Sequence, residues 1–324
     1  VHLQWKDGPL NLRSHETDSS FSAAVVANGR FYSIVDEAAL STPGQEGLPD
    51  KWSLIARDAF NGVELWRIPI SAWGWREWKD TWFTCRPGDM PFNLEMRIVA
   101  HSDGERLYVT LGYHAPVSEI DGRTGEILRT FEQTEATREI LQLDDTLILS
   151  IADSHVRGAE ARVAALDLKT GELLWQTEKL YGGTVTDYLK WKAMHGEVAD
   201  QTVDPALNLA TNGKVVVMID ETQIVALNLA TGDEAWSADL SSLQEPTLWL
   251  GALIASDDVI LYADRNRMFG LSADTGEIVW QQDKKYIGHL WYEWKEIFLI
   301  DGVVWTWSPE MVRGVGGLIS SPDS

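Results

Sequence analysis

The stretch Ala165-Leu166-Asp167-Leu168-Lys169-Thr170-Gly171-Glu172-Leu173-Leu174-Trp175 decides the fold of this chain. Residues 163–168 are apolar and favour a β-strand, and Lys169-Thr170-Gly171 predicts a tight turn in which Gly171 can take a positive φ. A second strand then ends on the tryptophan. The pattern returns four times, at 56–66, 119–129, 226–236 and 270–280. In one copy, 119–129, the final Trp is replaced by Arg129. Such a repeat outranks other signals, because it predicts one structural unit used several times.

A second pair of short strands precedes each copy. The two strands of each pair are separated by turn residues, namely Asn28-Gly29, Asp103-Gly104, Asp144-Asp145, Asn212-Gly213 and Asp257-Asp258. Each unit is therefore predicted to be a four-stranded antiparallel sheet. One such sheet cannot bury both of its faces alone. Radial stacking of neighbouring sheets buries them, which predicts an all-β protein with a β-propeller fold.

The propeller is predicted to be a single domain over residues 21–311, after a lead-in over 1–20 and before a tail over 312–324. The expected blades are 21–70, 96–132, 138–178, 207–240, 250–283 and a partial sixth at 294–311. Five full repeats and a partial sixth do not obviously close a ring. Either residues outside this sequence complete the ring, or the N-terminal segment finishes the sixth blade, or the ring stays open. We favour the first, because an open ring leaves strand edges unpaired.

The repeat x-A-L-D-x-x-T-G-x-x-x-W resembles the PQQ-like (quinoprotein alcohol dehydrogenase-like) β-propeller repeat. The chain is also similar to BamB-like scaffolds of the outer-membrane assembly machinery. Residues 56–62 and 107–112 resemble planctomycete-type PQQ-repeat proteins. The resemblance implies a quinoprotein-like propeller and an exported bacterial protein, periplasmic or extracellular. It also raises the question of a quinone cofactor, which in the quinoprotein dehydrogenases lies between a Trp and a vicinal disulfide beside a calcium ion.

Composition narrows the function classes. The 27 Lys and Arg against 49 Asp and Glu give a net charge of −22, which disfavours nucleic acid and also a polyanion, unless a local basic pocket overrides the field. No apolar run is long enough for a membrane span. Cys85 is the only cysteine, so the vicinal disulfide cannot form and PQQ is disfavoured. No cofactor is expected, although Asp36, Glu37 and Asp153 could ligate Ca²⁺.

The expected insertions at 38–51, 71–95, 153–160, 179–206 and 284–293 all join strands at the same end of the blades, so they should crowd one face. Long loops on a rigid scaffold commonly carry function. These loops hold aromatic candidates for ligand binding, namely Trp73, Trp75, Trp78, Trp82, Trp191, Trp291 and Tyr292. Flat aromatic rings among charges suit a glycan or a protein partner. The alternative is that they fold inward as small loop cores.

Catalysis on that face would use His195 or His114 as a general base, with Tyr188 or Arg76 as partner. Each histidine could equally be structural. The repeat tryptophans have a different predicted role, docking between blades as structural residues; they are Trp66, Trp175, Trp236 and Trp280. Three functions stay open: an exported binding module, a carbohydrate-active lyase or hydrolase, and, disfavoured, a PQQ-dependent oxidoreductase.

Overall fold

The computed structural model describes residues 21–36, 51–71, 98–112, 114–152, 160–182, 209–220, 223–240, 252–263, 267–283 and 297–306. Over these ranges the chain consists of β-strands and turns, with one short 3₁₀ helix, η2 (Glu132–Thr134). Two compact units divide the chain. The first contains the described residues up to Tyr181, and the second those from Gly182 onward.

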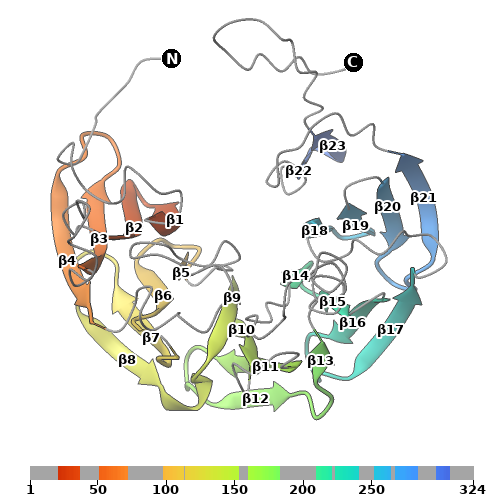
Figure 1. Cartoon of the computed structure of the whole chain (residues 1–324), viewed down its shortest axis with the longest axis horizontal. Coiled ribbons are helices and arrows are strands. Elements are labelled where there is room, and N and C mark those ends of the chain that lie inside the picture. Colours follow the sequence, from red (N-terminus) through yellow and green to blue (C-terminus); the bar gives the residue numbers. More distant parts are fainter. Residues whose placement is uncertain are drawn as a thin grey trace, which may run out of the picture. The chain divides into compact units, whose positions relative to one another are not determined.

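The first unit contains three antiparallel sheets whose strands pair in chain order (Figure 1). Sheet 1 consists of β1 (Phe21–Ala27), β2 (Arg30–Asp36), β3 (Trp52–Asp58) and β4 (Glu64–Ile70). Sheet 2 consists of β5 (Ile98–Ala100), β6 (Arg106–Thr110), β7 (Val117–Asp121) and β8 (Ile127–Phe131). Sheet 3 consists of β9 (Thr137–Leu143), β10 (Thr146–Ala152), β11 (Glu160–Asp167) and β12 (Leu173–Gln176), and β13 (Tyr181–Gly182) also pairs with β11.

The second unit repeats this plan. Sheet 4 consists of β14 (Leu209–Thr211), β15 (Val215–Asp220), β16 (Gln223–Asn228) and β17 (Glu234–Asp239). Sheet 5 consists of β18 (Ala252–Ala255), β19 (Val259–Ala263), β20 (Arg267–Ser272) and β21 (Ile278–Asp283). A further pair follows, β22 (Ile297–Ile300) and β23 (Val303–Thr306). The predicted four-stranded antiparallel blades, five complete and one partial, are confirmed; η2 and β13 are additions to that prediction.

The turn between the third and fourth strands has the same construction in successive sheets. In sheet 3, one Asp167 carboxylate oxygen accepts the backbone N–H groups of Lys169 and Thr170, both at 2.8 Å. The Asp167 carbonyl accepts the Gly171 N–H at 2.7 Å, and Gly171 has φ +78°. The same side-chain acceptor position is filled by Asp58, Asp121, Asn228 and Ser272. The D-x-x-T-G motif is therefore an Asx-type turn closed by a left-handed glycine.

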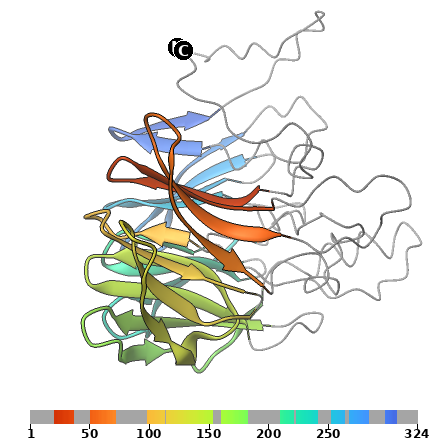
Figure 2. The same cartoon turned by 90° about the vertical axis from the view of Figure 1, so that its left-hand side faces the viewer.

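Hydrophobic clusters lie between successive sheets within each unit. Leu54 of sheet 1 and Leu107 of sheet 2 belong to one cluster, and Val117 of sheet 2 and Leu149 of sheet 3 to the next. In the second unit Trp236 packs among the buried residues of sheets 4 and 5. Within the first unit, β1, β5 and β9 contact one another in succession, while β4, β8 and β12 lie outermost (Figure 1). Corresponding strands of these sheets run in the same direction, and the short turns of the sheets lie together at one end (Figure 2).

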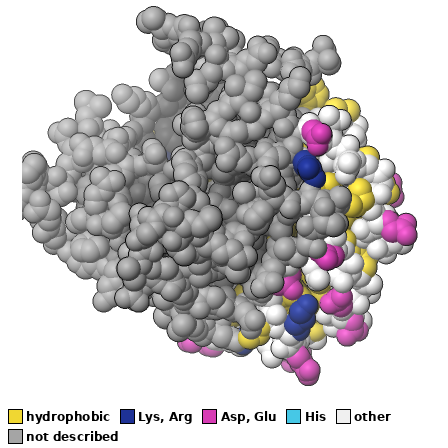
Figure 3. Space-filling model, turned by 45° about the vertical axis from the view of Figure 1, so that its right-hand side comes forward, with side chains coloured by type: hydrophobic (Ala, Val, Ile, Leu, Met, Phe, Trp, Pro, Cys, Tyr) yellow, Lys and Arg dark blue, Asp and Glu magenta, His cyan; other side chains and the backbone are white. Residues whose placement is uncertain are grey.

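The described surface mixes carboxylates with exposed apolar side chains. Figure 3 shows Asp and Glu scattered among hydrophobic groups with few Lys or Arg between them. Many of the exposed apolar residues occupy the two positions before the final residue of the repeat: Leu65, Ile127, Leu128, Leu173, Leu174, Ile278 and Val279. Several of the outermost strands therefore leave apolar side chains exposed, while Trp66, Trp175 and Trp236 on these strands are buried.

Candidate functional site

Two of the repeat tryptophans, Trp66 and Trp236, lie between successive sheets of the same unit. Trp66 is buried, and its indole N–H donates to the carbonyl of Gly122 in the turn of sheet 2 at 3.0 Å. In the second unit Trp236 is also buried, and its indole N–H donates to the carbonyl of Ala273 in the turn of sheet 5 at 2.8 Å. Each tryptophan thus ties the outer strand of one sheet to the β-turn of the next.

The turn glycine is required for this contact as well as for its backbone angle. Gly125 has φ +78°, and a Cβ placed on it would lie 2.8 Å from Cδ2 of Trp66. A Cβ on Gly276, with φ +73°, would lie 2.4 Å from Cε3 of Trp236. Both distances are below ordinary van der Waals contact, so a side chain here would push the indole out of its place.

A small residue lies opposite each tryptophan in the sheet. The paired residues are Ala56 and Trp66, Ala165 and Trp175, Ala226 and Trp236, and Gly270 and Trp280. Trp175 is buried, whereas Trp280 is partly exposed. Small partners are needed because the indole covers them; a Cβ on Gly270 would lie only 2.1 Å from Nε1 of Trp280. Sheet 2 departs from this rule at both positions, where Glu119 pairs with Arg129.

An ion-pair network replaces the tryptophan in sheet 2. Glu119 is buried, with its side chain 2% exposed, and one of its oxygens accepts from Arg129 Nε at 3.0 Å and from Arg129 Nη2 at 2.7 Å. Its other oxygen accepts from Arg106 Nη1. Arg129 also donates to the carbonyl of Leu168 in the turn of sheet 3, and its guanidinium lies 4.6 Å from the centre of the Phe131 ring. The arginine therefore makes the same link to the next turn that the tryptophans make elsewhere.

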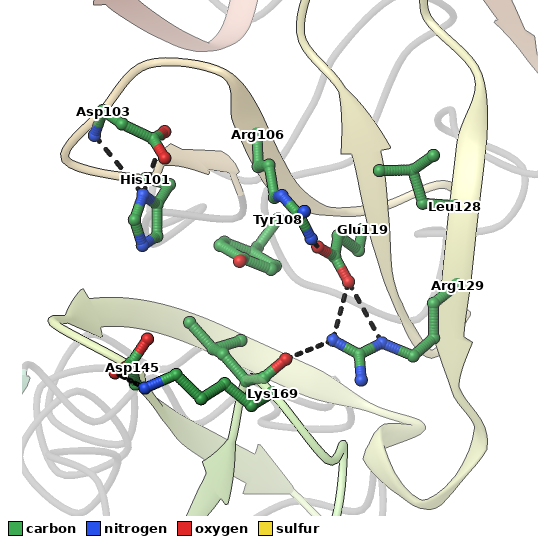
Figure 4. A pocket seen from close by; sticks show the side chains of 10 residues that line it. His101, Asp103, Arg106, Tyr108, Glu119, Leu128, Arg129, Asp145 and Lys169 are labelled. Atoms are coloured by element: carbon green, nitrogen blue, oxygen red, sulfur yellow. Dashed lines mark hydrogen bonds and ion pairs between the residues drawn. The ribbon is translucent and has the colours of Figure 1, made fainter.

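The slimmer side chain leaves a cavity at this junction. The cavity has a volume of about 650 Å³ and lies between the turn ends of sheets 2 and 3 (Figure 4). We call it the Arg–Glu pocket; its lining is His101, Asp103, Arg106, Tyr108, Glu119, Leu128, Arg129, Asp145, Leu168 and Lys169. It lies at the end of the blades that carries the tight turns, opposite to the end where the sequence predicts the long loops.

The carboxylates around the Arg–Glu pocket are paired with neighbours. Asp103 has a lowered pKa, chiefly because its carboxylate accepts the backbone N–H of Glu105 at 2.8 Å, with a further contribution from His101, whose Nδ1 lies 2.9 Å from it. Lys169 donates to Asp145, and this contact raises the pKa of the lysine. Asp103 is therefore ionised at neutral pH, and both carboxylates have positive or donating groups beside them.

Tyr108 is the exception in the pocket. The residue as a whole is 1% exposed and lines the cavity, and Figure 4 shows its ring among the other lining side chains. Burial raises the pKa of Tyr108 to about 12, with the Glu119 charge as the next cause. The hydroxyl makes no hydrogen bond to any residue in the described part of the chain. A hydroxyl that lines a cavity without a protein partner is free to donate to a group that enters the pocket.

Sequence reasoning missed the Arg–Glu pocket, although a signal was present. Arg129 stands out as the one copy without Trp, and Glu119 stands where the other copies have Ala or Gly. The two departures occur in one copy and lie opposite each other in the sheet. Charged residues at two positions that are otherwise apolar and small indicate a local change of function or specificity.

Most of the predicted site residues lie outside the described part of the chain. They are Arg76, Trp73, Trp75, Trp78, Trp82, Tyr188, Trp191, His195, Trp291 and Tyr292. The loop face built from them stays a prediction. The same holds for Ca²⁺, because Glu37 and Asp153 lie outside the described ranges, and for the disfavoured quinone, because Cys85 does so too. Over the described strands and turns, no three His, Cys, Asp or Glu side chains converge as a metal site, and no helix could span a membrane.

His114 is the one predicted catalytic residue within the described ranges. It has φ +58°, and its Nε2 lies 2.8 Å from Nη2 of Arg138, which is buried. A guanidinium can only donate, so Nε2 accepts and the neutral imidazole carries its proton on Nδ1. The lone pair that a general base would use is thus engaged by Arg138 in this structure.

Comparison with solved structures supports the fold. The chain is similar to BamB from Moraxella catarrhalis, with a TM-score of 0.51 and 12% identity over 88% of this chain and 66% of that one. It is also similar to a europium-containing methanol dehydrogenase, with a TM-score of 0.52 and 13% identity over 83% of this chain and 53% of that one. A quinohemoprotein alcohol dehydrogenase from Pseudomonas putida HK5 matches with a TM-score of 0.50 and 14% identity over 82% of this chain and 42% of that one. This chain spans between about two fifths and two thirds of their lengths. The predicted quinoprotein-like β-propeller is confirmed.

Comparison with curated protein sequences gave no match. A family model does match, and it is described as outer membrane protein assembly factor BamB. It matches residues 50–187 and again residues 159–288, which together cover more than half of the chain. The chain therefore belongs to the BamB family of PQQ-like propeller repeat proteins.

Proposed function

We propose that this chain is a β-propeller scaffold that binds a protein partner, and that the Arg–Glu pocket is part of the binding surface. The observation that carries the proposal is the substitution of the Ala–Trp pair by Glu119 and Arg129. It keeps the link between two blades and opens a polar cavity at their junction. A blade junction does not need an ion pair for this link, as the tryptophan junctions of Trp66 and Trp236 demonstrate.

The chemistry of the pocket favours binding over catalysis. Both oxygens of Glu119 accept hydrogen bonds from guanidinium groups, so this carboxylate holds the junction together. Among the hydrogen-bond donors that line the cavity, the half-exposed Arg106 and the hydroxyl of Tyr108 both lie on β6, a strand that cannot easily move. Donors on rigid elements are suited to recognising a surface.

A protein partner fits this pocket better than a glycan does. Sugar rings are bound by stacking on exposed aromatic faces, and the only aromatic side chain of the pocket, Tyr108, is 1% exposed. Leu128 at the rim is 45% exposed and offers an apolar contact beside the charges, which is the usual anatomy of a protein interface. The glycan-binding and carbohydrate-active alternatives depend on the loop face and remain predictions.

We also propose that the protein acts outside the cytoplasm, in the periplasm or beyond it. The support is the description of its family as an assembly factor for outer membrane proteins. Fractionation of cells that produce the full protein tests this location, and recovery of the protein only in the cytoplasmic fraction would contradict it.

Site-specific photo-cross-linking tests the scaffold function. A photoreactive residue at Leu128 lies at the rim of the pocket. One at Leu65 provides a matched control, because it also directly precedes the final residue of its repeat copy and is equally 45% exposed. We expect a discrete cross-linked protein from position 128 and none from position 65 in the producing cells. Equal labelling at both positions, or none at either, would contradict a partner at this pocket.

The enzyme alternative is tested on the same purified protein. A panel of neutral and uronate-containing polysaccharides, and dye-linked alcohol oxidation with added PQQ, should give no turnover. Turnover that is lost in His114→Ala would establish an enzyme and overturn the scaffold proposal.

A further inference from the structure

We propose that the Arg–Glu pocket binds a single carboxylate, the side chain of a Glu or Asp in the protein partner. This inference rests on the proposed scaffold function and names the chemistry that the pocket recognises. Two features support it. Hydrogen-bond donors that face the cavity outnumber their protein partners, and the charges of the pocket already balance, which leaves those donors available.

The donors come from Arg106 and Tyr108. Arg106 is 49% exposed and uses one terminal nitrogen, Nη1, to bond Glu119; a guanidinium has several further N–H donors. In the described part of the chain those further donors have no partner. Tyr108 offers a hydroxyl that makes no hydrogen bond to a described residue, on a side chain that lines the cavity (Figure 4).

The carboxylates already present each have another partner. Glu119 is held through both oxygens, Asp145 is paired with Lys169, and Asp103 accepts from Glu105 and lies beside His101. The charges of the pocket therefore balance within it: Arg106, Arg129 and Lys169 against Asp103, Glu119 and Asp145. What is missing is an acceptor for the remaining donors, and a carboxylate has the greatest acceptor capacity of the protein side chains.

The charge of the whole chain limits the rest of the ligand. At −22 the protein repels a polyanion at long range, and the exposed Asp103 and Asp145 flank the pocket. A lone acidic side chain within a neutral or basic segment meets both conditions. Its carboxylate reaches Arg106 and Tyr108, while neighbouring cations face the acidic rim.

Peptide binding to the full chain tests this inference. The probe is a short fluorescein-labelled Lys/Ser peptide with one central Glu, compared by anisotropy with the same peptide carrying Gln. Non-specific attraction to an acidic protein favours the more positive Gln peptide, so tighter binding of the Glu peptide reports the carboxylate itself. We expect a preference of about tenfold for Glu, the size of one or two hydrogen bonds to a charged group.

Variants assign the preference to the pocket. Tyr108→Phe removes only a hydroxyl that makes no bond within the described protein, so the fold should be unaffected while the Glu preference is lost or sharply reduced. Arg106→Gln should abolish the preference, and Arg123→Gln, with the same loss of charge on an exposed turn of sheet 2, should retain it. Equal binding of both peptides to the unmodified protein, binding of neither, or an unchanged preference in Tyr108→Phe and Arg106→Gln would overturn the inference. Cross-linking from position 128 would in that case still support a partner, with a different chemistry.

Discussion

Restoring the repeat pair in sheet 2 tests how the blade junctions work. Glu119→Ala alone leaves Arg106 and Arg129 without their counter-charge. Breaking a fully buried pair costs about 3–5 kcal/mol, but Arg129 is 28% and Arg106 49% exposed, so water compensates part of the loss and we expect about 2–3 kcal/mol. Arg129→Trp alone places an indole against Glu119, where every other sheet has Ala or Gly, and should cost about as much.

The double variant Glu119→Ala/Arg129→Trp should recover most of this loss. Burying a tryptophan to the same extent as Trp66 removes roughly 150–250 Å² of surface from water, which stabilises the fold by about 4–6 kcal/mol gross. The indole would take the place of the ion pairs and fill part of the cavity. We therefore expect the double variant to lie within about 1 kcal/mol of the unmodified chain, with a coupling energy of at least ~2 kcal/mol. It should also lose the preference for the Glu peptide, because the indole occupies the pocket.

Urea unfolding followed by far-UV circular dichroism and Trp fluorescence measures these differences, with Arg123→Ala as an exposed control expected within about 0.5 kcal/mol. If the double variant is as unstable as the worse single variant, the two junction types are not interchangeable and the reasoning fails.

Three further predictions concern the same junctions. Gly125→Ala should destabilise by about 1–2 kcal/mol more than Gly29→Ala, because both have positive φ but only the first Cβ would overlap Trp66; equal losses in urea unfolding would mean that the indole contact is unimportant. Trp66→Phe should cost about 2 kcal/mol, since it removes packing and the bond to the Gly122 carbonyl, and a neutral result in the same assay would count against the stapling role. Above pH 10 a tyrosine in the unfolded chain loses its proton before Tyr108 does in the folded chain, where its pKa is about 12. The free energy of unfolding should therefore fall between pH 10 and 12. Tyr108→Phe should lose about 2 kcal/mol less over this range, and identical pH profiles would contradict the raised pKa of Tyr108.

The repeat fixed the strands because its local chemistry is self-contained. Asp167, Thr170 and Gly171 form a turn through hydrogen bonds between residues close together in the sequence. The apolar stretch before the turn is then placed to pair with the strand that follows it. Such short-range interactions can be read from a single sequence. η2 and β13 could not be read, because they have no repeat and no turn motif of their own.

The candidate site was harder to predict for a physical reason. The sequence shows that Arg129 and Glu119 both depart from the repeat pattern, but it does not show that the two side chains meet. Only pairing across β7 and β8 shows that the two departures lie opposite each other, and only the stacking of sheet 3 shows that Arg129 reaches Leu168.

The sequence by itself determined the fold class, the blade unit and the positions of the tryptophans that join the blades, since these follow from periodicity and local turns. The tertiary structure decided where a cavity opens. That depends on the volume left when Arg replaces Trp between two packed sheets, and on the side chains, such as Tyr108, that line the space. Both quantities belong to contacts between residues far apart in the chain, which a repeat pattern does not contain.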